Sequence, residues 1–104
     1  MKDIELIKNK FRKGEYAVSD HAIMEARKDG IEPATVKKLE WTAINGEVIE
    51  EYLDRDRLLI YAELEEDYLP VHIVVDYSDK EEPVIVTSYV PDSRNWIKFK
   101  KRKK

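Results

Sequence analysis

The two histidines are the side chains of this sequence best suited to acid–base chemistry near neutral pH. His21 follows Ser19, a good helix N-cap, and is therefore predicted to lie in the first turn of a helix. The positive end of the helix dipole disfavours an imidazolium there, although the neighbouring Asp20 acts in the opposite direction. A neutral imidazole accepts protons, so His21 is a candidate general base. The alternative is that its ring packs on a sheet or helps to cap the helix.

Arg27 is the candidate for stabilising negative charge. It lies six residues after His21 on the same predicted helix, about 120° around the axis, but its side chain is long enough that we expect it to reach a pocket shared with His21. A guanidinium binds phosphate with two hydrogen bonds or stabilises charge that develops in a transition state. The alternative is a partner in a surface ion pair.

The second histidine, His72, lies inside the apolar run 71–75. If a hairpin pairs Val74 with Thr87, alternation of side chains places His72 opposite Tyr89 on one face of the sheet. His72, Thr87 and Tyr89 would then form a polar patch on a mainly apolar sheet. A register slip of one residue would replace this partner with Ser88. The alternative role for His72 is a buried histidine bonded to a hydroxyl, which only stabilises the core.

Several kinds of site are not predicted. The chain has no cysteine, which excludes disulfides, thiolate nucleophiles and cysteine-based zinc sites. The histidines lack the short spacings of metal sites, and there is no phosphate-binding loop, dinucleotide fingerprint or nucleophile elbow, so we expect neither metal nor cofactor. Trp41 and Trp96 are expected to pack, with Trp96 anchoring the C-terminal segment.

The elements that must position these residues are predicted to be helices first and strands second. Three helices are indicated: one after the cap Asp3, ending at Gly14, then 20–29 and 33–45. Period-two patterns then predict strands over residues 47–53, 57–64, 69–77 and 84–90. The short connections favour an antiparallel meander. We therefore predict an α+β fold with about three N-terminal helices on one face of a four-stranded antiparallel sheet.

Charge is spread unevenly over the 104 residues, which are enough for one domain. Residues 98–104 hold six of the 19 basic side chains and no acidic ones, leaving residues 1–97 with a net charge of −9. We expect a single domain over 1–97 and a basic C-terminal tail over 98–104. The tail either attracts phosphate, is simply solvated, or folds back on the acidic surface. An acidic body disfavours broad nucleic-acid binding, so RNA would be met at a local site.

The N-terminal sequence and the lengths of the apolar runs bear on localisation. No apolar run approaches 18 residues, and the N-terminus lacks the apolar region of a signal peptide. We therefore expect a cytoplasmic protein with no membrane span.

Several short motifs in order resemble a small bacterial and archaeal family known as domain of unknown function 4258. The resemblance covers about residues 16 to 96, and no single motif is strong. It rests on the order Ser-x-His-Ala at 19–22, Gly-x-Val-Ile at 46–49, Pro-x-His at 70–72 and Thr-x-Tyr-x-Pro at 87–91. That family is similar, by fold-level proposals, to the ribonuclease toxins of the barnase/colicin/RelE-like group.

The resemblance implies RNA cleavage without a metal, in which the ribose 2′-hydroxyl attacks the adjacent phosphate. His21 would be the general base or acid and Arg27 the charge stabiliser. His72, Thr87 and Tyr89 would assist from the sheet, and a protein antidote would be the partner of a toxin-type module.

The second hypothesis is a non-catalytic interaction or regulatory domain. It is motivated by the acidic body, by the absence of a strong catalytic motif, and by the single arginine in the segment 24–27, where family members often have two. It predicts that His21 and His72 are satisfied internally and that an apolar patch or a homodimer face is exposed.

Overall fold

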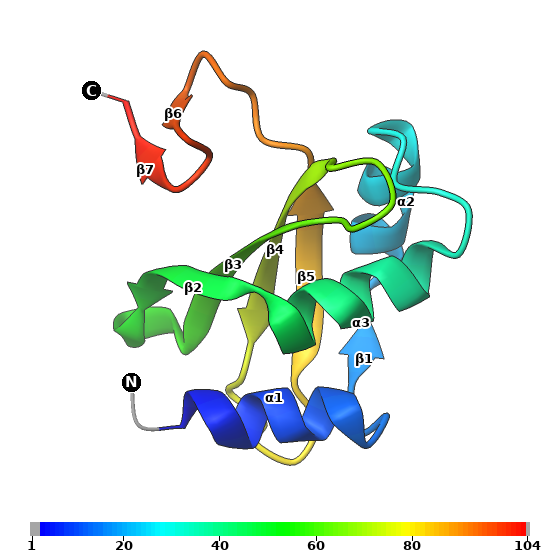
Figure 1. The fold of residues 1–104 in the computed structure, drawn as a ribbon. Coiled ribbons are helices and arrows are strands. Elements are labelled where there is room, and N and C mark those ends of the chain that lie inside the picture. Colours follow the sequence, from blue (N-terminus) through cyan, green and yellow to red (C-terminus); the bar gives the residue numbers. More distant parts are fainter. Residues whose placement is uncertain (1–2, 104) are drawn as a thin grey trace.

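The computed structural model of the chain describes residues 3–103 and has an α+β architecture (Figure 1). Its helices precede the long strands, as the sequence predicts. The elements are α1 Ile4–Arg12, β1 Ala17–Val18, α2 Asp20–Lys28, α3 Thr35–Asn45, β2 Glu47–Tyr52, the 3₁₀ turn η1 Leu53–Arg55, β3 Arg57–Glu63, β4 Pro70–Asp76, β5 Val84–Tyr89, β6 Trp96–Ile97 and β7 Lys101–Arg102.

The main sheet differs from the predicted four-stranded antiparallel meander. It has five strands in the order β1-β5-β4-β3-β2, and β1 runs parallel to β5. The other pairings are antiparallel, as expected. The sheet is therefore mixed, and the prediction was wrong in its strand number and in its purely antiparallel character.

The missed strand, β1, is only two residues long. It is held to β5 by hydrogen bonds from the backbone N of Ala17 to the carbonyl of Pro83 and from the N of Ser19 to that of Ile85, both 3.0 Å long. Two residues carry no periodicity, so no sequence pattern marks this strand. Its position matters because α2 begins at Asp20, directly after this strand and its cap Ser19.

The three helix starts show which of the predicted N-terminal caps form in the structure. The side chain of Ser19 accepts a 3.0 Å hydrogen bond from the backbone N of Ala22, as expected of an N-cap. Asp3 makes no such side-chain bond at α1. Helix α3 begins at Thr35 rather than at Pro33, because Ala34 has a left-handed backbone with φ of 58° that cannot continue into a helix.

One face of the sheet forms the hydrophobic core together with all three helices. Fully buried residues of the strands, including Ile60, Ile73 and Ile85, pack in one cluster with Phe11 of α1, Ala22 and Ala26 of α2, and Leu39 of α3. The prediction that the helices cover one face of the sheet is confirmed. Burial of this apolar surface supplies most of the driving force for folding.

The C-terminal end of α3 joins α1 and β3. The Nζ of Lys8 donates hydrogen bonds to the carbonyls of Ala43, Ile44 and Gly46 at 3.1, 2.9 and 2.8 Å. A cation is favourable there because the last carbonyls of a helix carry partial negative charge. A side chain at Gly46 would come within 2.6 Å of Ile60, so only glycine fits this junction.

The C-terminal segment folds back on the body. Residues 98–103, predicted to belong to a basic tail, form a hairpin with Trp96 and Ile97, and the hairpin lies apart from α1 in Figure 1. Lys104, the last residue of that tail, lies outside the described residues. Over residues 3–103, no helix is long and apolar enough to span a membrane.

Candidate functional site

Helix α2, which carries His21 and Arg27, is fixed along strand β5. The hydroxyl of Ser19 donates to the carbonyl of Val86 at 3.1 Å, and the hydroxyl of Ser88 donates to the carbonyl of Ala22 at 2.6 Å. At the other end of the helix, Asp29 accepts a 2.8 Å hydrogen bond from the backbone N of Val90. The backbone beside His21 therefore has a defined position against β5.

His21 and Arg27 themselves are exposed. Neither side chain has a hydrogen bond or ion pair with another residue of the 3–103 range. His21 is thus not satisfied internally, and its side chain is free to meet a ligand. Arg27 lines a shallow concavity of about 410 Å³ together with Glu32, Pro33 and residues 34–37.

The register of β4 and β5 brings His72 and Tyr89 together. Val74 pairs with Thr87, so His72 faces Tyr89, and the alternative slip to Ser88 does not occur. Ser88 instead points to the helix side of the sheet, where it bonds to Ala22. Thr87 is half-buried on the His72 face and makes no side-chain hydrogen bond within the described part of the chain.

His72 is fully buried, and both of its ring nitrogens are engaged. Its Nε2 lies 2.6 Å from the carbonyl oxygen of Phe99, and its Nδ1 lies 3.2 Å from the hydroxyl of Tyr89. Because a carbonyl can only accept, Nε2 carries the proton and Nδ1 accepts from Tyr89. The ring of Trp96 stands edge-on to the imidazole at 4.5 Å.

The hairpin closes over this histidine through further polar contacts. The guanidinium of Arg102 donates two hydrogen bonds to Glu50, at 2.9 and 3.1 Å, and lies 4.6 Å from the centre of the Trp96 ring. Glu50 also accepts a hydrogen bond from the hydroxyl of Tyr52. We call His72, Tyr89, Glu50, Tyr52, Trp96 and Arg102 the His72 cluster.

Burial and charge set the protonation of the cluster. Desolvation lowers the pKa of His72, and the bond to Phe99 and the charge of Glu50 only partly oppose this. Burial acts against ionisation of Glu50 as well, but the hydrogen bonds from Arg102 and Tyr52 outweigh it and keep its pKa below the ordinary value. Near neutral pH the cluster therefore contains a neutral histidine beside a carboxylate–guanidinium pair.

The structure does not join the two groups of predicted residues in one hydrogen-bonded site. His72 and Tyr89 contact each other beneath the hairpin, whereas His21 and Arg27 lie on α2 and make no hydrogen bond to them within residues 3–103. Neither histidine lines the concavity beside Arg27 or the three others that lie around Tyr77, Trp41 and Ile49. Over the same residues, no three side chains of metal-ligating type come together.

Several residues of the His72 cluster were not predicted. Glu50 and Tyr52 are two residues apart on β2 and share a face, which is a usable signal once the sheet order is known. The sequence pattern indicates Arg102 only as one basic residue of the predicted tail, not as a partner of Glu50. Trp96, in contrast, anchors the C-terminal segment as predicted.

Comparisons with known protein families, with curated proteins and with solved structures found no match to this chain. The resemblance noted from the motifs therefore stays a prediction. The case for a function rests on the residues described above.

Proposed function

We propose that the protein is a small RNA-cleaving domain that acts without a metal, with His21 as its general base. The observation that carries the proposal is the state of His21: an exposed imidazole with no partner among residues 3–103, on a backbone held by the Ser19 and Ser88 hydrogen bonds. A base must be accessible and must start from a defined backbone position, and the exposed imidazole on the fixed start of α2 supports the proposal on both counts.

The proposed reaction is transesterification at phosphorus. His21 accepts the proton of a ribose 2′-hydroxyl as the 2′-oxygen attacks the adjacent phosphorus atom. The bond from phosphorus to the 5′-oxygen breaks, and the departing oxygen takes a proton from solvent. The products are a 2′,3′-cyclic phosphate and a 5′-hydroxyl, and His21 returns its proton to solvent.

Arg27 is the proposed stabiliser of the charge that develops on phosphate. Its guanidinium is exposed and lies about one and two-thirds turns from His21 on α2, where it is free to take two phosphate oxygens. Thr87 and Tyr89 flank Ser88, the residue that holds α2, but their side chains lie on the opposite face of the sheet from α2. They are therefore proposed to contact the rest of the bound strand from β5, not the phosphate at His21.

His72 takes a positioning role in this proposal. Both of its nitrogens are occupied and its side chain is fully buried beneath the hairpin, so it is not placed to touch RNA. By accepting the hydroxyl proton of Tyr89, it fixes the direction of that ring on β5.

The test is a cleavage assay with EDTA present, comparing wild type with His21→Ala and the exposed control Lys28→Ala on the same helix. We expect His21→Ala to lower the rate by about 10²- to 10⁴-fold and the control to retain it. A substrate with one 2′-deoxy nucleotide should resist cleavage after that nucleotide. Equal rates for wild type and His21→Ala would overturn the assignment of His21.

A non-catalytic interaction domain is the second candidate, and the internal bonding of His72 favours it. Exposed apolar side chains such as Leu6, Met24 and Tyr68 offer contact area for a protein partner, either an antidote or a second copy. No cleavage by folded protein of several RNA types, with a sedimentation measurement showing a dimer or a complex, would favour this candidate.

A further inference from the structure

The hairpin divides its basic side chains between two directions. Lys100 and Arg102 turn toward the sheet, where they pair with Glu47 at 3.1 Å and with Glu50 at 2.9 Å. Lys98, Lys101 and Lys103 are exposed and make no ion pair with any other residue of the 3–103 range. The two inward cations offset acidic groups of β2, so the three outward lysines form a local positive surface on an acidic protein.

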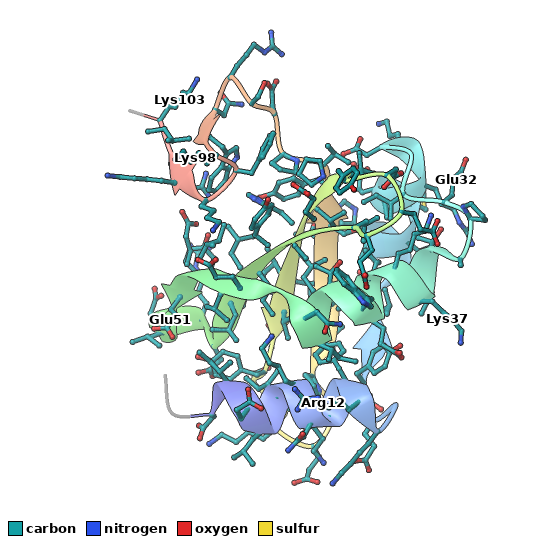
Figure 2. All side chains as sticks on the ribbon, viewed as in Figure 1. Arg12, Glu32, Lys37, Glu51, Lys98 and Lys103 are labelled. Carbon is teal, nitrogen blue, oxygen red and sulfur yellow. The ribbon has the colours of Figure 1, made fainter. Side chains whose placement is uncertain are left out.

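The outward lysines sit on an ordered scaffold rather than on a free tail. Trp96 pairs with Arg102, and the backbone N of Lys103 donates to the carbonyl of Asn95 at 2.9 Å, which extends the ladder by one residue. Strand alternation then places Lys101 and Lys103 on the same side, roughly 7 Å apart along the chain. Lys98 lies in the turn that connects the two strands of the hairpin, and Figure 2 shows Lys98 and Lys103 at the opposite end of the view from Arg12.

We propose that this outward surface, Lys98, Lys101 and Lys103, binds the phosphate backbone of single-stranded RNA. The identity of the ligand rests on the proposed function, but the surface is separate from His21 and Arg27. Lysines fixed on a hairpin lose less conformational freedom on binding than lysines on a disordered tail, which favours affinity. Each lysine that contacts a phosphate releases counterions, so binding weakens as salt rises.

A single strand of RNA fits this surface better than an anionic membrane does. The remainder of the protein, residues 1–97, carries a net charge of −9. A flat anionic surface brings these acidic groups close and is repelled by them, whereas a narrow strand can follow the hairpin alone. Beyond a Debye length of about 8 Å the acidic groups are screened from the strand at physiological salt.

The experiment measures the Kd of a fluorescent 2′-O-methyl oligoribonucleotide, which cannot be cleaved through its 2′-oxygen, between 50 and 200 mM salt. The test variant carries Lys98→Gln, Lys101→Gln and Lys103→Gln. The control carries Lys13→Gln, Arg55→Gln and Lys80→Gln, three exposed basic residues away from both the hairpin and Arg27, so both variants have the same net charge. Thermal unfolding verifies that both are folded.

We expect the hairpin variant to weaken binding at least about tenfold at 50 mM salt and to reduce the slope of log K against log salt by about 2, with little change in the control. Equal weakening by both variants would show that net charge alone is responsible and would overturn the proposal. A loss seen on phosphatidylserine vesicles but not on RNA would overturn it in favour of a membrane. Because the oligonucleotide is not a substrate, loss of binding and loss of cleavage are distinguished.

Discussion

The two faces of the central sheet are covered by different kinds of contact. The helix-side face packs Ile60, Ile73 and Ile85 against apolar side chains of three helices. The opposite face holds the His72 cluster beneath a short hairpin, through hydrogen bonds, an ion pair and aromatic contacts. Apolar burial is insensitive to direction, to pH and largely to salt, whereas the contacts of the hairpin depend on all three. The same sheet therefore has one face built for stability and one that responds to conditions.

The largest expected effect lies on the apolar face. Ile73 is fully buried, and Ile73→Ala should lower the free energy of unfolding by about 2–5 kcal/mol, through lost transfer energy and the cavity left behind. Urea unfolding measures this, with Leu53→Ala as the control, because Leu53 is 65% exposed. A loss no greater than that of the control would contradict the assignment of this face as the core.

On the opposite face, His72→Phe should lower the free energy of unfolding by about 1–3 kcal/mol. The carbonyl of Phe99 and the hydroxyl of Tyr89 would lose their hydrogen-bond partner while they remain beneath the hairpin. Hydrogen exchange should quicken at the amides of 96–103 before those of β3 and β4. Tyr89→Phe removes only one of the two bonds and should have a smaller effect. Unchanged exchange in the hairpin would show that His72 does not hold it.

The dependence of the unfolding free energy on pH should also distinguish the two faces, by a smaller amount. The folded-state pKa of His72 lies below its ordinary value of 6.5, mainly through desolvation, so the unfolded chain takes up a proton first as pH falls. The stability contributed by neutral His72 is complete above pH 6.5 and declines below it. Tyr61 and Tyr89 face the ring, and the charges of Glu50 and Arg102 act on it. The pKa of Glu50 lies below its ordinary value of 4.5, so the stability that its carboxylate contributes is lost only below pH 4.5.

The measurement is the unfolding free energy of wild type minus that of His72→Gln between pH 7.5 and 5. We expect the difference to shrink as pH falls, by less than the whole effect of His72→Phe, because a protonated ring still donates to Phe99. A difference that grows with falling pH would mean that the cluster favours the imidazolium.

The smallest expected effect concerns the turn of the hairpin. Lys98 and Phe99 both have left-handed backbones, with φ of 53° and 63°. Asparagine tolerates this conformation better than lysine does, so Lys98→Asn should stabilise the hairpin by less than about 1 kcal/mol. Slower exchange at the amides of Lys101 and Arg102 would be the sign, and faster exchange would argue against strain in the turn.

The fold was predictable where local chemistry and periodicity agree. Ser19 caps α2, and the four strands β2 to β5 begin and end within about a residue of the period-two segments. The pairing of His72 with Tyr89 followed from alternation once one register was assumed. In these places a short stretch of sequence determines its own structure.

The remainder depends on contacts between distant residues. Strand β1 is too short to show a pattern, and its partner lies 67 residues away. In the hairpin turn, Lys98 and Phe99 occupy the left-handed positions where Asn-Gly would make a tight turn recognisable from sequence. Without that dipeptide, residues 98–104 resemble a solvated run of basic side chains. Of the candidate site, the residue types were identified, but the burial of His72 was not, because it depends on Trp96 and the hairpin folding over it.

The bonds that fix α2 to β5 have a consequence for synthesis of the chain. Ser19 and Ala22 find their partners at Val86 and Ser88, 66 to 67 residues later in the sequence. A nascent chain that has emerged only as far as β4 contains α2 but lacks the strand to which α2 is hydrogen-bonded. The domain therefore closes late, when its fifth strand leaves the ribosome, and a chain stopped before residue 84 should be recognised by chaperones and proteases as unfinished.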